Sequence, residues 1–92
     1  MARVHVPSLV RDLTGGAEQV EVPLPPGRGA TVADLLRELE RRFPGVSERL
    51  LQDGDLMPGL AVFVDGVQGH MKLAEHLDAD SQVHFLPALV GG

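Results

Sequence analysis

Apolar and polar residues alternate in two stretches near the N-terminus, and this alternation predicts a pair of strands. Residues 3–7 read RVHVP and residues 18–24 read EQVEVPL. A period of two is the pattern of a strand that buries one face. Between the stretches, Gly15 and Gly16 can take positive φ and allow the chain to reverse. We therefore expect a hairpin-like pair joined by a loop longer than a tight turn.

A single apolar stripe with helical spacing follows. Its members are Val32, Leu35, Leu36, Leu39 and Phe43. They fall at i, i+3, i+4, i+7 and i+11, so they share one face of a helix. Thr31 with Asp34 three residues later forms an acidic version of the capping box at the helix start, and Pro44-Gly45 ends it.

The second half of the chain predicts short elements. We expect a helical turn at 47–51, a strand at 60–64, a short edge strand at 67–71 and a last strand at 82–86. The dipeptide Asp65-Gly66 is typical of a turn, and Pro87 stops the final strand.

One amphipathic helix requires one apolar sheet face to cover. The residues expected on that face are Val4, Val6, Val20, Val22, Leu24, Val62, Val64, Val83 and Phe85. The prediction is an α+β sandwich with a mixed sheet of four to five strands and one main helix. The pattern alone leaves ferredoxin-like alternatives open, although such a domain needs a second long helix and the sequence has no second long stripe.

Composition and charge narrow the functional classes. The chain has 92 residues, which is one small domain. Its net charge of −5 argues against a nucleic-acid partner, and it has no apolar run long enough to span a membrane. We expect a soluble cytoplasmic protein. Because it lacks cysteine, thiolate metal sites and cysteine nucleophiles are excluded.

The remaining polar residues show no constellation for catalysis or metal binding. The four histidines, His5, His70, His76 and His84, have no short metal-ligand spacing. No serine has a recognisable base partner, and no glycine-rich loop opens a helix. We expect no metal, no bound cofactor and no catalytic side chain.

The end of the chain carries the one chemical feature. After a domain at 1–87, the expected tail is Ala88, Leu89, Val90, Gly91 and Gly92. Fully extended, five residues reach about 16 Å. Terminal glycines are an ordinary frayed end in many chains, but here they follow a strand stopped by proline. Without a Cβ at either residue, the terminal carboxyl carbon is open to a nucleophile. Since a carboxylate is a poor acyl donor, it would first need conversion to a mixed anhydride such as an acyl-adenylate.

These features resemble the ubiquitin-like small sulfur carriers of the ThiS/MoaD group over nearly the whole chain. The resemblance rests on Val10-Arg11-Asp12-Leu13 before the glycine turn, the single helix, and residues 83–87 leading to Val90-Gly91-Gly92. It implies a ubiquitin-like β-grasp fold with the first and last strands parallel in the centre. It also implies that a ubiquitin-activating-like enzyme uses ATP to adenylate Gly92. The adenylate would then become a thiocarboxylate that donates sulfur, with Gly91 as the slender residue behind it.

The sulfur acceptor is less specified. Residues 5–11 followed by Thr14-Gly15-Gly16 look most like carriers that feed a cysteine synthase or a pathway to sulfur-containing metabolites. A molybdopterin synthase small subunit is an alternative, although Leu86 stands where an aromatic residue is common there. A ubiquitin-like modifier, joined to lysines of other proteins through Gly92, is a second alternative.

Strand alternation also predicts a docking surface. With Val62 and Phe85 inward, Phe63, His84 and Leu86 should face outward on neighbouring strands, with His5 at their border. An apolar group beside a reactive tail favours a surface that binds the activating enzyme.

Overall fold

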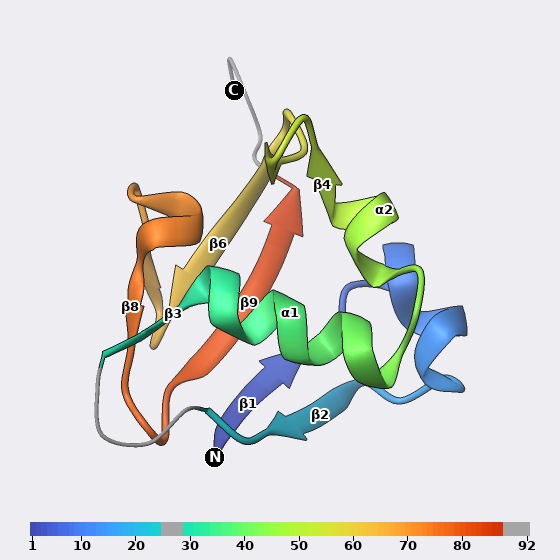
Figure 1. Ribbon diagram of the computed structural model, residues 1–92, viewed down its shortest axis with the longest axis horizontal. Helices are drawn as coiled ribbons and strands as arrows, with labels where there is room; N and C mark the ends of the chain where they lie inside the picture. The colour runs from blue at the N-terminus through green and yellow to red at the C-terminus, as the bar shows by residue number, and fades with distance from the viewer. Residues whose placement is uncertain (25–28, 88–92) are drawn as a thin grey trace.

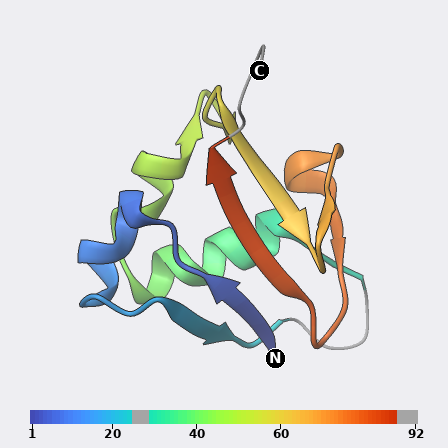
Figure 2. The same cartoon turned by 180° about the vertical axis from the view of Figure 1, so that it is seen from behind.

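A five-stranded mixed sheet forms one layer of the molecule. The computed structural model describes residues 1–24 and 29–87. The sheet contains β1 (Ala2–His5), β2 (Gln19–Val22), β6 (Leu60–Val64), β7 (Val67–Gln68) and β9 (Gln82–Pro87) in the order β2-β1-β9-β6-β7. The two strands that start and end the described chain lie side by side, as both cartoons show (Figure 1, Figure 2).

The register confirms the topology expected of a β-grasp domain. Strands β1 and β9 are parallel, with Val4 opposite Val83. The other neighbours in the sheet are antiparallel, with Val4 opposite Val20 and Val62 opposite Phe85. A parallel pair needs a crossover, and the segment carrying the helix supplies it.

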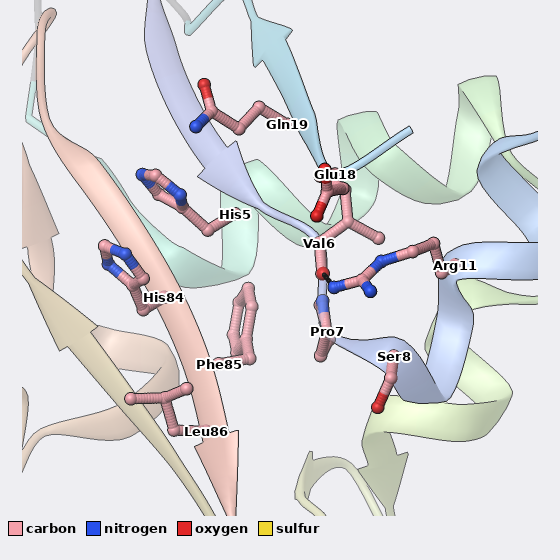
Figure 3. A pocket seen from close by; sticks show the side chains of 10 residues that line it. All are labelled: His5, Val6, Pro7, Ser8, Arg11, Glu18, Gln19, His84, Phe85 and Leu86. Atoms are coloured by element: carbon pink, nitrogen blue, oxygen red, sulfur yellow. Dashed lines mark hydrogen bonds between the residues drawn. The ribbon is translucent and has the colours of Figure 1, made fainter. Parts of the chain in front are cut away.

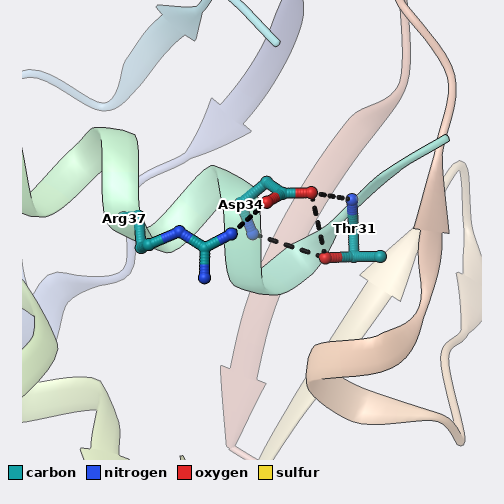
Figure 4. A network of polar contacts seen from close by, with 3 residues as sticks. All are labelled: Thr31, Asp34 and Arg37. Carbon is teal, nitrogen blue, oxygen red and sulfur yellow. Dashed lines mark hydrogen bonds and ion pairs between the residues drawn. The ribbon is translucent and has the colours of Figure 1, made fainter. Parts of the chain in front are cut away.

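One helix, α1 (Val32–Arg42), covers one face of this sheet (Figure 1). The predicted capping box is present: the Asp34 carboxylate accepts the backbone N–H of Thr31 at 2.9 Å, and Thr31 Oγ1 accepts the backbone N–H of Asp34 at 3.4 Å (Figure 4). Arg37 pairs with the same carboxylate. The hydrogen bond from Thr31, more than the arginine, holds the pKa of Asp34 below its usual range.

The core lies between α1 and the sheet. Its fully buried members include Val4, Val22, Val32, Leu35, Val62, Val83 and Phe85. All the residues predicted to face inward belong to the core or pack against it, with Leu24 and Val64 only partly buried. The face of the sheet opposite α1 has no helix over it in the described part of the chain (Figure 2).

The connection between β1 and β2 is more ordered than the sequence suggested. A 3₁₀ helix, η1 (Ser8–Thr14), fills it and buries Val10. Gly15 ends this helix with a φ of 69°, which confirms the predicted positive φ. A short run of this length has no clear apolar period, so the sequence pattern predicts only a loop here.

A second short helix, α2 (Val46–Leu50), follows α1 almost directly. Gly45, at a φ of 106°, makes the turn between them. The Glu40 carboxylate accepts the backbone N–H groups of Gly45 at 3.0 Å and Ser47 at 2.9 Å, and these bonds lower its pKa. The helical turn predicted at 47–51 therefore exists and begins one residue earlier.

Several smaller elements complete the chain. These are the strand pairs β3 (Ala30–Thr31) with β8 (His76–Leu77) and β4 (Leu51–Gln52) with β5 (Asp55–Leu56), and the 3₁₀ turn η2 (Lys72–Ala74). The edge strand expected at 67–71 is only two residues long, since the chain turns after it and Lys72 takes a φ of 53°. None of the helices described here is both long and apolar enough to cross a bilayer.

Candidate functional site

A row of side chains crosses the outer face of the sheet, the face opposite α1. Phe63 on β6 lies directly opposite His84 on β9, which in turn lies opposite His5 on β1. The two imidazole rings stack, with centroids 3.7 Å apart and an angle of 9° between their planes. Aromatic pairs stabilise one another across strands. The row is therefore a rigid, flat surface built on central strands.

The surroundings of His84 favour the neutral form of its imidazole. Partial burial, and to a smaller extent the nearby His5, hold the pKa of His84 below its usual value of 6.5. His5 Nε2 donates to the side-chain oxygen of Gln82 over 3.2 Å, which fixes that ring in place. His84 thus adds a neutral ring to the row at neutral pH.

Leu86 extends this row toward the C-terminal tail. Its side chain is 45% exposed, whereas its neighbour in the strand, Phe85, is 1% exposed. The predicted outward group of Phe63, His84 and Leu86 therefore lies on one face, with His5 in the row rather than only at its border. We call these four side chains the outer patch. Its role in docking stays a prediction.

The tail itself lies outside the described residues. This applies to Ala88, Leu89, Val90, Gly91 and Gly92. Strand β9 ends at Pro87, directly after Leu86, so the tail begins where the outer patch ends. The domain boundary at 87 and the roles assigned to the five tail residues stay predictions.

A groove of about 450 Å³ runs between the ends of β1 and β9 and the start of η1 (Figure 3). His5, His84 and Leu86 form one side of it, so the groove continues the outer patch. Ser8 and Arg11 reach it from η1. Sequence reasoning noted Arg11 only within a motif and missed the groove, because no pattern places η1 beside the end of β9.

Arg11 is held in an unusual setting. Its Nη2 donates to the carbonyl oxygen of Val6 at 2.8 Å (Figure 3). Its Nε is buried and has no hydrogen-bond partner in the structure. Buried polar atoms are nearly always bonded, so an exception at a surface groove needs an explanation.

Catalysis or metal binding by side chains requires particular groups held close together. Within residues 1–24 and 29–87, no three or more metal-ligating side chains come together. His84 faces His5 and Phe63, and among the described residues no hydrogen bond joins a hydroxyl to either imidazole. A nucleophile beside a base is the usual sign of intrinsic catalysis.

Fold and surface together define a ubiquitin-like β-grasp protein with a diglycine end. The chain belongs to the ThiS family, whose family model matches residues 4–92. This match confirms the family resemblance drawn from the sequence, and it extends through the terminal glycines.

Characterised relatives fall into two groups. The chain is 30% identical over 94 aligned positions to the sulfur carrier protein CysO of Mycobacterium tuberculosis, covering 97% of this chain and 96% of that one. It is 37% identical over 65 residues to small archaeal modifier protein 3 of Haloferax volcanii, covering 68% and 71% of the two chains. The family thus comprises small carriers and ubiquitin-like modifiers.

Solved structures agree on the fold. CysO in the BexX/CysO complex of Amycolatopsis orientalis superposes with a TM-score of 0.83 at 28% identity, covering all of both chains. CysO of Mycobacterium tuberculosis gives 0.82 at 26% identity, covering 97% of this chain and all of that one. SAMP1 of Haloferax volcanii superposes with a TM-score of 0.76 at 24% identity, covering 99% of this chain and 98% of that one. At this identity the likeness supports a shared fold and nothing further. The predicted β-grasp fold is confirmed.

Proposed function

We propose that this chain is a sulfur carrier whose C-terminal Gly92 is converted to a thiocarboxylate that donates sulfur in biosynthesis. The observation that carries the proposal is the full-length match to the ThiS family and to CysO, reaching a Gly91-Gly92 terminus. A ubiquitin-activating-like enzyme is the first partner and uses ATP. The acceptor enzyme makes cysteine or a sulfur-containing metabolite.

The chemistry needs only the terminal carboxyl group of this chain. A carboxylate oxygen of Gly92 attacks the α-phosphorus of ATP, and pyrophosphate leaves with the electrons of the broken P–O bond. A hydrosulfide then attacks the acyl carbon, the bond to AMP breaks, and one proton goes to solvent. The absence of a Cβ at both terminal residues lets the chain end pass through a narrow channel in the enzyme.

The outer patch is the docking surface in this proposal. It ends at Leu86, one residue before the last described residue, Pro87, so an enzyme that binds Phe63, His84 and Leu86 contacts the domain beside the start of the tail. Partly exposed aromatic and aliphatic residues on a sheet are the usual anchors of such contacts.

The test is intact-protein mass spectrometry of the chain incubated with its activating enzyme, ATP and sulfide. We expect the mass gain of one sulfur replacing one oxygen, located at the C-terminus by fragmentation. Deleting Gly92, or adding one residue after it, should abolish the gain. Sulfur incorporation that survives the deletion would contradict the proposal.

The resemblance of residues 5–11 and Thr14-Gly15-Gly16 to carriers that feed a cysteine synthase favours an acceptor that makes cysteine over a molybdopterin synthase role. With a cysteine synthase and its activated serine, the thiocarboxylate form should gain a cysteinyl residue. Its sulfur attacks the activated serine carbon and expels the leaving group. An S-to-N acyl shift then moves the acyl group to the amine. Return to the carboxylate only with a molybdopterin precursor and large subunit would favour the other acceptor.

A protein modifier is the second candidate, since the chain is 37% identical to small archaeal modifier protein 3 over 65 residues. In that role the Gly92 carboxyl would form an isopeptide bond to lysines of other proteins. Immunoblots of cells that express the tagged chain separate the two roles. A ladder of conjugates that disappears on deletion of Gly92 indicates a modifier, whereas a thiocarboxylate without a ladder indicates a carrier.

A further inference from the structure

The lysine and arginine side chains of this protein differ in whether they form ion pairs. Of the eight lysines and arginines, Arg28 lies outside the described residues, and five of the remaining seven form ion pairs with carboxylates. Arg42 makes no ion pair, but it donates to the carbonyl oxygen of Glu21 at the outer edge of β2. Only Arg11 combines the lack of an ion pair with a place in a groove.

The acidic residue next to Arg11 in the chain, Asp12, pairs with a different arginine. Asp12 follows Arg11 in the chain, yet it accepts from Arg49 Nη1 at 2.6 Å. This hydrogen bond is the main reason why the pKa of Asp12 lies below its usual range. Arg49 also donates to the carbonyl oxygen of Leu9 at 3.2 Å. The pair therefore fastens α2 to η1 and leaves Arg11 with only the Val6 carbonyl.

We propose that the groove at the end of β9 receives an acidic side chain of the partner protein, whose carboxylate pairs with Arg11. The inference rests on the proposed function for the identity of that partner, the activating enzyme. The groove shares His5, His84 and Leu86 with the outer patch, so one partner surface can cover both. A guanidinium presents its donors in a planar fork that matches a carboxylate.

The geometry of η1 supports this assignment. In a 3₁₀ helix, residues three apart lie one above the other, which puts Ser8 and Arg11 on the same side. Ser8 is exposed, and its hydroxyl can add a second donor. The Val6 carbonyl holds the guanidinium in place before a partner arrives, which lowers the entropic cost of binding.

Glu18 makes the groove selective. It lines the groove from the side of β2 and forms no ion pair with Arg11. An acidic partner group must approach Arg11 against this negative charge. Loss of the Glu18 charge should therefore strengthen binding, and loss of the Arg11 charge should weaken it.

The first experiment measures the Kd between the chain and the activating enzyme by calorimetry, without turnover. Arg11→Gln should weaken binding about 10- to 30-fold, and Arg11→Lys less. Glu18→Gln should tighten binding about twofold at low salt. Arg42→Gln is the matched control, because Arg42 is the other described arginine without an ion pair and does not line the groove, and its Kd should equal the wild-type value.

Salt dependence separates a charge contact from a loss of local structure. Added salt should weaken the wild type more steeply than Arg11→Gln, since the variant lacks the screened charge. An unchanged Kd for Arg11→Gln, or parallel salt curves for the two proteins, would overturn the inference. Thermal unfolding of each variant shows whether it is folded at the temperature of the measurement. If Arg11→Gln is unfolded there, Arg11→Lys replaces it in the comparison with the wild type.

A second experiment does not depend on the proposed function. N-acetylglutamate amide, titrated into the isotope-labelled wild-type chain, should shift the Arg11 Nε–H and Ser8 amide resonances, whereas N-acetylglutamine amide should not. Equal shifts with both compounds, or none, would overturn the inference. If the wild type does not bind the activating enzyme but responds to glutamate, the proposed function fails while the acid-binding groove stands.

Discussion

The two faces of strand β9 differ in burial: one belongs to the core and the other to the outer patch. Val83 and Phe85 point toward α1 and are 0% and 1% exposed. His84 and Leu86, between and after them, point to the outer face and meet His5 and Phe63 on the neighbouring strands. Because side chains alternate along a strand, one residue step separates the core from the candidate binding surface.

This comparison separates two properties of the same strand. The inner face stabilises the domain, and the outer face carries the outer patch that we propose as a docking surface. A change on one face should leave the other property nearly unaffected. Each prediction below tests that separation, from the largest expected effect to the smallest.

The largest effect should come from Phe85→Ala, on the inner face. Phe85 is among the largest fully buried side chains, and truncating a buried phenylalanine costs about 3–5 kcal/mol through lost burial and the cavity left behind. Small domains have little stability to spare. Urea unfolding followed by circular dichroism should show a largely unfolded variant, or a strongly lowered midpoint. A loss below about 1 kcal/mol would contradict the role assigned to the inner face.

Phe63→Ala should show the reverse pattern. Phe63 is only partly buried, and its ring lies in the outer patch opposite His84. Aromatic anchors dominate binding energies, so we expect a loss of about 2 kcal/mol in binding to the activating enzyme. Calorimetry gives that value, and unfolding should show a smaller change than for Phe85→Ala. Val67→Ala, at an exposed apolar residue of β7 outside the patch, is the control and should bind like the wild type.

The sequence predicted the inner face better than the outer one. Period-two and helical patterns identified the core residues, because burial forces apolar residues into register. The parallel pairing of β1 with β9 came from the family resemblance and not from the pattern. Alternation placed Phe63 and His84 on the outer face, and the resemblance placed their strands side by side. The stacking of His5 on His84 and the groove around Arg11 depend on rotamers and on where η1 packs, and no periodic signal records either.

A smaller effect should follow from Asp34→Ala, which removes the capping box of α1. The carboxylate bonds the backbone N–H of Thr31 at 2.9 Å, and a lost N-terminal cap costs about 1 kcal/mol. Arg37→Ala removes only the exposed partner of the same carboxylate and should change stability by less than about 0.5 kcal/mol. Since α1 covers the inner face, neither variant should alter binding at the outer patch. A Kd raised as much as by Phe63→Ala would show that the faces are coupled.

The smallest effect is the pH dependence that His84 gives to stability and to binding at the outer patch. Its pKa is lowered in the folded chain, first by burial and then by His5, so the unfolded chain binds more protons as the pH falls below about 6.5. Stability contributed by neutral His84 is therefore fully present above that pH and is lost as the pH falls through the folded pKa. Urea unfolding at about pH 7.5 and pH 5.5 should show a larger loss of stability at the lower pH for the wild type than for His84→Gln.

His5→Gln removes only the smaller cause of the lowered His84 pKa, the nearby His5. NMR titration should therefore show a His84 pKa that rises but stays below that of an exposed histidine. An equal pH dependence in the wild type and His84→Gln would mean that His84 is protonated in the folded chain without loss of stability. In that case, binding to the activating enzyme should be equally strong at neutral and acidic pH. If protonation of His84 does destabilise the folded chain, binding should weaken at acidic pH together with stability.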